Sequence, residues 1–206
     1  MKKYPMLIFA SFVGLQAGFS QIHPVGRLPD GEVIYRAEVD FRRFAQRFAL
    51  QRAPEWCWAA SISNIFAFYG YDVPQEEIVT RVYGGLVDMP VRTDAEIIQL
   101  LSDNWESRDG RKFHSVITAG FDVEQGGNIS NQDIVNELSN GRPLIVCNTS
   151  HCMVLTLFDF TQMRAVNASV FDPYTGPRRL SPVEFTVPQM GGQLRFLAAV
   201  EIVGDD

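Results

Sequence analysis

The segment from Trp56 to Tyr69 constrains the fold more than any other part of the sequence. It is dense in Ala, Ile and Phe, its polar residues Ser61, Ser63 and Asn64 cluster as a helix would allow, and Gly70 ends it. We therefore expect the best-defined helix of the chain here. Hydrophobic residues make up 46% of the 206 positions, which is enough for a buried core in one domain or two closely packed halves.

The remaining patterns divide the chain into a helical front half and a strand-rich back half. Residues 21–44 carry several Pro, Gly and Asp residues, which predicts a lead-in segment rather than a packed element. Helix signals then cover residues 76–83, 93–101 and 130–138, and strand-like runs cover residues 144–148, 152–158, 166–171 and 194–203. The expected fold class is α+β, with one domain over residues 45–206 made of a helical lobe (about 45–103) and an antiparallel β-sheet lobe (about 128–206).

The first twenty residues are typical of a secretory signal peptide. Lys2 and Lys3 precede an apolar run at residues 7–13, and small residues around Gly18 and Ser20 fit a cleavage site before residue 21. The alternative is a membrane anchor, but the apolar stretch is interrupted and shorter than the roughly 20 residues that a spanning helix needs. We expect a secreted or periplasmic protein with no stable membrane insertion after the signal is removed.

Charge and cysteine content narrow the function. The net charge is −6 and charged residues make up 20% of the chain, so the basic excess that nucleic acid binding requires is missing. The chain has three cysteines, Cys57, Cys147 and Cys152. An oxidising compartment usually pairs cysteines, so an odd number leaves one thiol with another role.

Cys57 is the first candidate for chemistry. It follows Pro54 and Glu55 and falls in the first turn of the expected helix, where unpaired backbone N–H groups and the helix dipole favour a negative charge. A thiol there ionises more readily, and the thiolate is the reactive form. The alternative is a small buried thiol, which Cys57 taken alone would favour.

Gln51, His151 and Asp172 are the candidate partners of Cys57. The amide of Gln51 and the backbone N–H of Cys57 could both donate to an oxyanion. His151 opens an apolar strand and Asp172 closes the next one, so a hairpin centred between residues 161 and 162 would place them opposite each other. An imidazole oriented by a carboxylate suits a general base. Each residue taken alone also has an ordinary structural interpretation. Gln51 would be a surface residue, His151 would cap the edge of a strand, and Asp172 would begin an Asp-Pro turn. His23 lies in the lead-in segment and His114 has no well-placed acidic residue at a strand end, so neither makes a comparable geometry.

These residues together resemble papain-like cysteine peptidases. The resemblance is carried by Gln51, by Trp56-Cys57-Trp58-Ala59-Ala60-Ser61, and by residues 140–146, 151–155 and 170–173. It points to the short bacterial secreted type, similar to staphopains, secreted effector peptidases and peptidases that trim bacteriocin leaders. The resemblance implies a helical lobe and a sheet lobe with the active site between them, Cys57 as nucleophile, His151 as general base and Asp172 as the group that orients it. Asp172 stands where papain has Asn, and Ser150 rather than a glycine precedes the histidine.

The implied function is a secreted cysteine peptidase that hydrolyses peptide bonds through an acyl-enzyme on Cys57. Its substrate would be a protein or peptide, and we expect a monomer with no cofactor. A transglutaminase-like amide or acyl transferase and a non-catalytic binding module are the alternatives. Cys147 and Cys152 are either a disulfide or two buried thiols. A zinc site formed by them and His151 matches no familiar ligand spacing, so we expect no metal.

Overall fold

The computed structural model describes residues 22–125 and 129–204, and the predicted signal peptide lies outside them. The described chain is α+β with an antiparallel sheet, which confirms the predicted fold class. The helices are α1 (Phe41–Arg47), α2 (Cys57–Tyr69), α3 (Gln75–Tyr83), α4 (Asp94–Leu100), α5 (Asn131–Ser139) and the 3-10 turn η1 (Pro188–Met190). The strands are β1 (His23–Arg27), β2 (Val33–Glu38), β3 (Asn104–Glu106), β4 (Lys112–Asp122), β5 (Leu144–Cys147), β6 (Cys152–Phe160), β7 (Ala165–Asp172), β8 (Gly176–Leu180) and β9 (Phe196–Gly204).

The nine strands of the described residues form one sheet that branches at β6. The main order is β1-β2-β6-β5-β9-β4-β3, and β7 pairs with both β6 and β8 away from this path. All the pairings are antiparallel. The start of β6, next to the β5–β6 turn, and the end of β7 therefore lie close together in the sheet.

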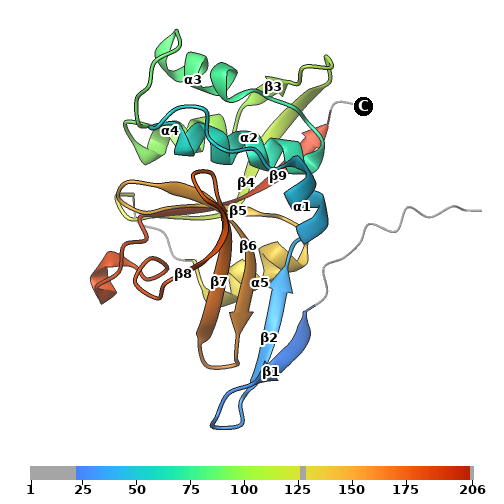
Figure 1. Cartoon of the computed structure of the whole chain (residues 1–206), viewed down its shortest axis with the longest axis vertical. Helices are drawn as coiled ribbons and strands as arrows, with labels where there is room; N and C mark the ends of the chain where they lie inside the picture. Colours follow the sequence, from blue (N-terminus) through green and yellow to red (C-terminus); the bar gives the residue numbers. More distant parts are fainter. Residues whose placement is uncertain (1–21, 126–128, 205–206) are drawn as a thin grey trace, which may run out of the picture.

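Helices α2 and α5 both pack against the sheet. Helix α2 packs against β5, β6 and β9, whereas α5 packs against β2, β6 and β4. In Figure 1, α2, α3 and α4 gather at one end of the molecule, next to β4, β5 and β9. Apolar side chains on several sides of α2 are buried, including Trp58, Ile62, Ile65 and Phe66. The helix ends at Gly70, whose φ of 101° is in the left-handed region that glycine adopts without strain. This burial fixes the position of the helix and of its first residue, Cys57.

The expectation that residues 21–44 form an unpacked lead-in is wrong for most of that segment. β1 and β2 form a hairpin through the turn at Gly31, and β2 pairs with β6. Ala37 and Val39 are buried, and α1 follows directly. The Pro, Gly and Asp residues that suggested a lead-in are confined to β1 and the hairpin turn, while residues 33–38 are rich in the β-branched and aromatic residues that strands favour.

Within residues 22–125 and 129–204, every helix falls short of the length and apolarity that crossing a membrane requires.

Candidate active site

Cys57 is the first residue of α2. The N-terminal N–H groups of a helix have no acceptor within the helix, and the helix dipole at this end favours a negative charge. Two indole N–H groups near this end fix the neighbouring loop: Trp56 donates to the carbonyl of Val87 at 2.7 Å and Trp58 to that of Met89 at 3.2 Å. Cys57 is partly exposed and is not in a disulfide. The position combines access to solvent with a rigid support.

His151 lies directly before β6 and joins Cys57 to Asp172. Its Nε2 is 2.7 Å from Oδ1 of Asp172, the last residue of β7, and the thiol of Cys57 lies near enough to its ring to contribute to the raised pKa of His151. Since Asp172 occupies Nε2, the nitrogen left for the thiol is Nδ1. The structure thus brings together three predicted residues from α2, the β5–β6 turn and the end of β7.

The strand register differs in detail from the predicted hairpin. Leu155 pairs with Val170 and Leu157 with Ser169, with an irregularity between them, so the turn lies one to two residues later than expected. His151 has no ladder partner of its own, and it reaches Asp172 diagonally through its side chain. A β-bulge shifts the strand register locally in this way, and the alternation of apolar and polar residues along the sequence does not reveal it.

Asp172 is the most enclosed member of the group, with only 4% of its surface exposed. Besides His151, it accepts hydrogen bonds from the backbone N–H of Tyr174 at 2.8 Å and from Nε of Arg178 at 2.8 Å. Burial would raise the pKa of Asp172, but the bonds from His151, Arg178 and Tyr174 hold that pKa well below its usual range. Asp172 is therefore an anion at neutral pH.

Arg178 and its second partner, Glu184, are not among the residues predicted from the sequence. Arg178 donates to Oε1 of Glu184 at 2.8 Å. This hydrogen bond is the largest contribution to the low pKa of Glu184, which is about 2. A signal did exist: Gly176 predicts a tight turn after Asp172, and in the resulting hairpin Arg178 pairs with Val170. Val170 and Asp172 are two residues apart on β7, so Arg178 shares their face of the sheet.

The pKa of His151 is raised to about 9. Burial acts to lower this pKa, but the hydrogen bonds and charges of Asp172 and Cys57 outweigh burial. The imidazole is thus held as a cation near neutral pH, next to a thiol on one side and a carboxylate on the other. Cys57 and His151 thus form a thiol and imidazole pair beside the carboxylate of Asp172.

A cleft of about 170 Å³ opens beside the pair. Cys57 and His151 both line it, with residues 90–94 on the helical side and the β5–β6 turn, residues 147–152, on the sheet side. Cys57 and His151 therefore face a solvent-accessible hollow.

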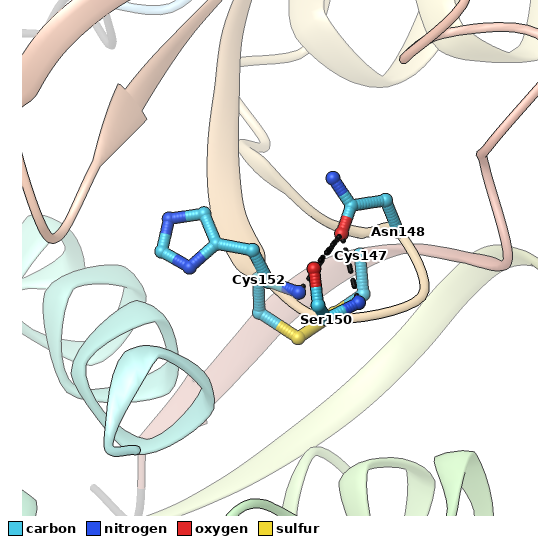
Figure 2. Close-up of a disulfide and its surroundings, with 5 residues drawn as sticks. Cys147, Asn148, Ser150 and Cys152 are labelled. Atoms are coloured by element: carbon cyan, nitrogen blue, oxygen red, sulfur yellow. Dashed lines mark hydrogen bonds between the residues drawn. A yellow bond between two sulfur atoms is a disulfide. The ribbon is translucent and has the colours of Figure 1, made fainter. Parts of the chain in front are cut away.

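The β5–β6 turn that carries His151 is fixed in two ways (Figure 2). Cys147 and Cys152 pair across the two strands and are joined by a disulfide. Within the turn, Oδ1 of Asn148 accepts the backbone N–H groups of Ser150 at 3.0 Å and His151 at 2.8 Å. Because both sulfurs are in the disulfide, Cys147 and Cys152 have no thiolate to offer zinc.

Gln51 lies close to the group, but its amide is engaged elsewhere. Nε2 donates to the carbonyls of Ala53 at 3.0 Å and Pro54 at 2.7 Å, and the buried Oε1 has no hydrogen-bond partner among the described residues. The backbone N–H of Gln51 donates to Pro173 at 2.8 Å and so links the loop before α2 to the residue after Asp172. Donation to an oxyanion would require the side chain to rotate and release one carbonyl, so this role stays a prediction.

The two rival histidines lie elsewhere in the fold. His23 is on β1, 3.9 Å from Glu38, and His114 is on β4, where Nδ1 is 3.1 Å from the side chain of Asn104. Neither lines the cleft.

Comparisons with known proteins identify a family match. The model of the family described as the Peptidase_C39 like family matches residues 38–186. No curated protein matches the chain.

Two solved structures show distant likenesses. A double glycine motif protease from an AMS/PCAT transporter, in complex with the leader peptide, is 14% identical with a TM-score of 0.39, covering 92% of this chain and 96% of that one. UfSP from C. elegans is 13% identical with a TM-score of 0.44, covering 98% of this chain and 36% of that one. At these identities and TM-scores, neither structure informs the roles of individual residues.

Proposed function

Because the chain belongs to the Peptidase_C39 like family, we propose that it is a cysteine peptidase that hydrolyses peptide bonds with Cys57 as nucleophile. The observation that carries the proposal is the meeting of Cys57, His151 and Asp172 beside a cleft that Cys57 and His151 line. A nucleophile, a base and a group that orients the base are the parts that acyl transfer requires.

In the proposed reaction, the thiolate of Cys57 attacks the carbonyl carbon of the substrate and forms a C–S bond. The tetrahedral intermediate collapses, the C–N bond breaks, and the imidazolium of His151 gives its proton to the leaving amine. His151 then takes a proton from water, whose oxygen attacks the thioester. The C–S bond breaks, the acid product leaves, and the proton held by His151 restores the starting pair.

Each residue of the group contributes a separate property to this cycle. Asp172 fixes the ring of His151 through Nε2, which leaves Nδ1 directed at Cys57 and stabilises the charged imidazole. The backbone N–H of Cys57, at the start of α2, is the first donor for the oxyanion. Gln51 would be the second donor after rotation of its amide away from Ala53 and Pro54.

We also propose that the protein is exported. The support is the signal-like pattern of residues 1–20 and the disulfide between Cys147 and Cys152, since disulfides persist mainly in oxidising compartments.

Replacement of Cys57 by Ala tests the proposed activity. The purified wild-type protein should cleave casein or a mixed peptide library, and Cys57→Ala should lose cleavage by at least about three orders of magnitude because the nucleophile is gone. Circular dichroism and the melting temperature should stay close to wild type, since Cys57 is only partly buried. Cleavage by Cys57→Ala at the wild-type rate would refute the proposed nucleophile.

A further inference from the structure

The third member of the catalytic group is a carboxylate in a place with almost no solvent. A buried carboxylate is unfavourable unless both oxygens have partners. Oδ1 of Asp172 has two, the ring of His151 and the backbone N–H of Tyr174. Among the described residues, the hydrogen-bond donor to Oδ2 is Arg178. His151 must gain and lose a proton during the reaction, so Arg178 is the permanent positive charge on this carboxylate.

Arg178 is itself held in place from several sides. Its terminal nitrogens contact Glu184 at 2.8 Å, the sulfur of Met153 at 3.0 Å and the carbonyl of Arg179 at 3.3 Å. Glu184 is fixed in turn by the backbone N–H and hydroxyl of Ser181, at 2.9 and 2.8 Å. The guanidinium is therefore aimed at Asp172 by a fixed frame rather than by a flexible surface contact.

We propose that Arg178, anchored by Glu184, is a positioning residue that keeps Asp172 ionised and directed at His151 during catalysis. The inference rests on the proposed peptidase function and adds a group that acts on the base through Asp172. The permanent positive charge of Arg178 also explains how the charged side chain of Asp, rather than the neutral one of Asn, is accommodated at position 172.

The charged groups that face Asp172 directly are His151 and Arg178, and each of them has a further titratable partner. His151 approaches from the start of β6 with Cys57 of α2 behind it, Arg178 lies on β8, and Glu184 follows β8. Without Arg178, the burial of Asp172 persists while Oδ2 loses its donor, so the pKa of Asp172 rises. A protonated Asp172 no longer stabilises the imidazolium, and the acidic limit of reactivity moves to higher pH.

The experiment compares Arg178→Met, Arg178→Lys and the matched control Arg179→Met. Arg179 is the next residue on β8 and is exposed, so its loss removes the same charge from the same strand. Two profiles are measured from pH 4.5 to 9: kcat/KM for a casein-derived peptide, and the rate of Cys57 alkylation by iodoacetamide. Arg178→Met should lower kcat/KM and the alkylation rate on the order of 10- to 100-fold at pH 5, and should lower them by a smaller factor at pH 8. Arg178→Lys should recover part of the loss, and Arg179→Met should match wild type.

The outcomes separate this inference from the proposed function. A folded Arg178→Met whose two pH profiles superimpose on those of Arg179→Met overturns the positioning role. If Arg178→Met does not fold, Arg178→Lys and Glu184→Gln carry the test, and unchanged profiles in both also overturn it. A wild-type protein that cleaves nothing refutes the peptidase, while the alkylation profiles still decide the role of Arg178.

Discussion

His151 lies between the carboxylate of Asp172 and the thiol of Cys57, and its raised pKa makes the stability of the folded protein depend on pH. With a folded-state pKa of about 9 and an ordinary value of 6.5, His151 binds its proton more tightly in the folded protein than in the unfolded chain. The stabilisation is fully present below pH 6.5 and is lost as the pH rises through about 9. Asp172 behaves oppositely: its stabilisation is present above the ordinary carboxyl pKa and is lost in acid.

Replacement of Asp172 by Asn tests this linkage. The variant keeps the size of the side chain but removes the anion that holds the proton on His151. Wild type should lose up to about 3 kcal/mol of its free energy of unfolding between pH 6.5 and 10 relative to Asp172→Asn. Urea unfolding at a series of pH values measures this difference. Parallel curves for the two proteins over the whole range would contradict the assigned charge states.

The residues of the site differ in how far the sequence could identify them. Cys57, His151 and Asp172 each lie at the end of a predicted helix or strand. Their residue types and these positions suggest from the sequence that the three side chains form one site. Arg178 required the pairing of β8 with β7, and β8 was not predicted. The orientation of the Gln51 amide depends on the carbonyls of Ala53 and Pro54, and no sequence pattern reports that local geometry.

At the scale of elements, the β5–β6 turn determines where His151 points. Asn148 accepts two backbone N–H groups within this turn, so its side chain shapes the segment that presents the imidazole. Asn148→Ala should lower kcat/KM about tenfold, with a loss of stability of about 1 kcal/mol. Steady-state kinetics and thermal unfolding check the two parts separately.

Thr161 provides the matched control at the other end of β6. Its hydroxyl accepts the N–H groups of Met163 and Arg164, both at 3.2 Å, and so shapes the β6–β7 turn in a similar way. Thr161→Ala should cost similar stability but leave kcat/KM near wild type, because this turn carries no reactive group. Equal losses of activity in both variants would mean that Asn148 acts through general stability alone.

The elements that the sequence predicted are those with local signals. The four expected helices match α2 to α5 within one or two residues, because their apolar periodicity and end residues lie inside each segment. The four expected strands correspond to β5, β6, β7 and β9. In contrast, β2 is defined by pairing with β6, more than 100 residues away, and no local pattern specifies that partner.

For the molecule as a whole, the N-terminal hairpin is a structural part of the sheet. Nε of Arg36 on β2 donates to Asp159 on β6 at 2.7 Å and Nη2 donates at 3.0 Å, forming a bidentate pair. Asp159 is only 6% exposed, so the charge depends on this partner. The family match begins at residue 38, so β1 and most of β2 lie before the matched segment.

Replacement of Arg36 by Met measures what the hairpin contributes. Arg36→Met leaves a buried carboxylate without its cation and should lower the free energy of unfolding by about 3 kcal/mol. Arg164→Met is the control, since Arg164 pairs with Asp30 while both side chains are more than half exposed, and should cost less than about 1 kcal/mol. Urea denaturation gives both values. A similar small cost for the two variants would show that the hairpin is only loosely attached.

We propose a reactive thiol at Cys57, and the family match, the fold and the cleft all support it. The most direct measurement is labelling with an active-site-directed epoxide, followed by mass spectrometry of the digested protein. We predict one label per chain, on Cys57, formed much faster than on a model thiol at pH 6 to 7, and lost in Cys57→Ala and strongly slowed in His151→Ala. A Cys57 that reacts no faster than the model thiol, or that reacts equally well without His151, would contradict the account.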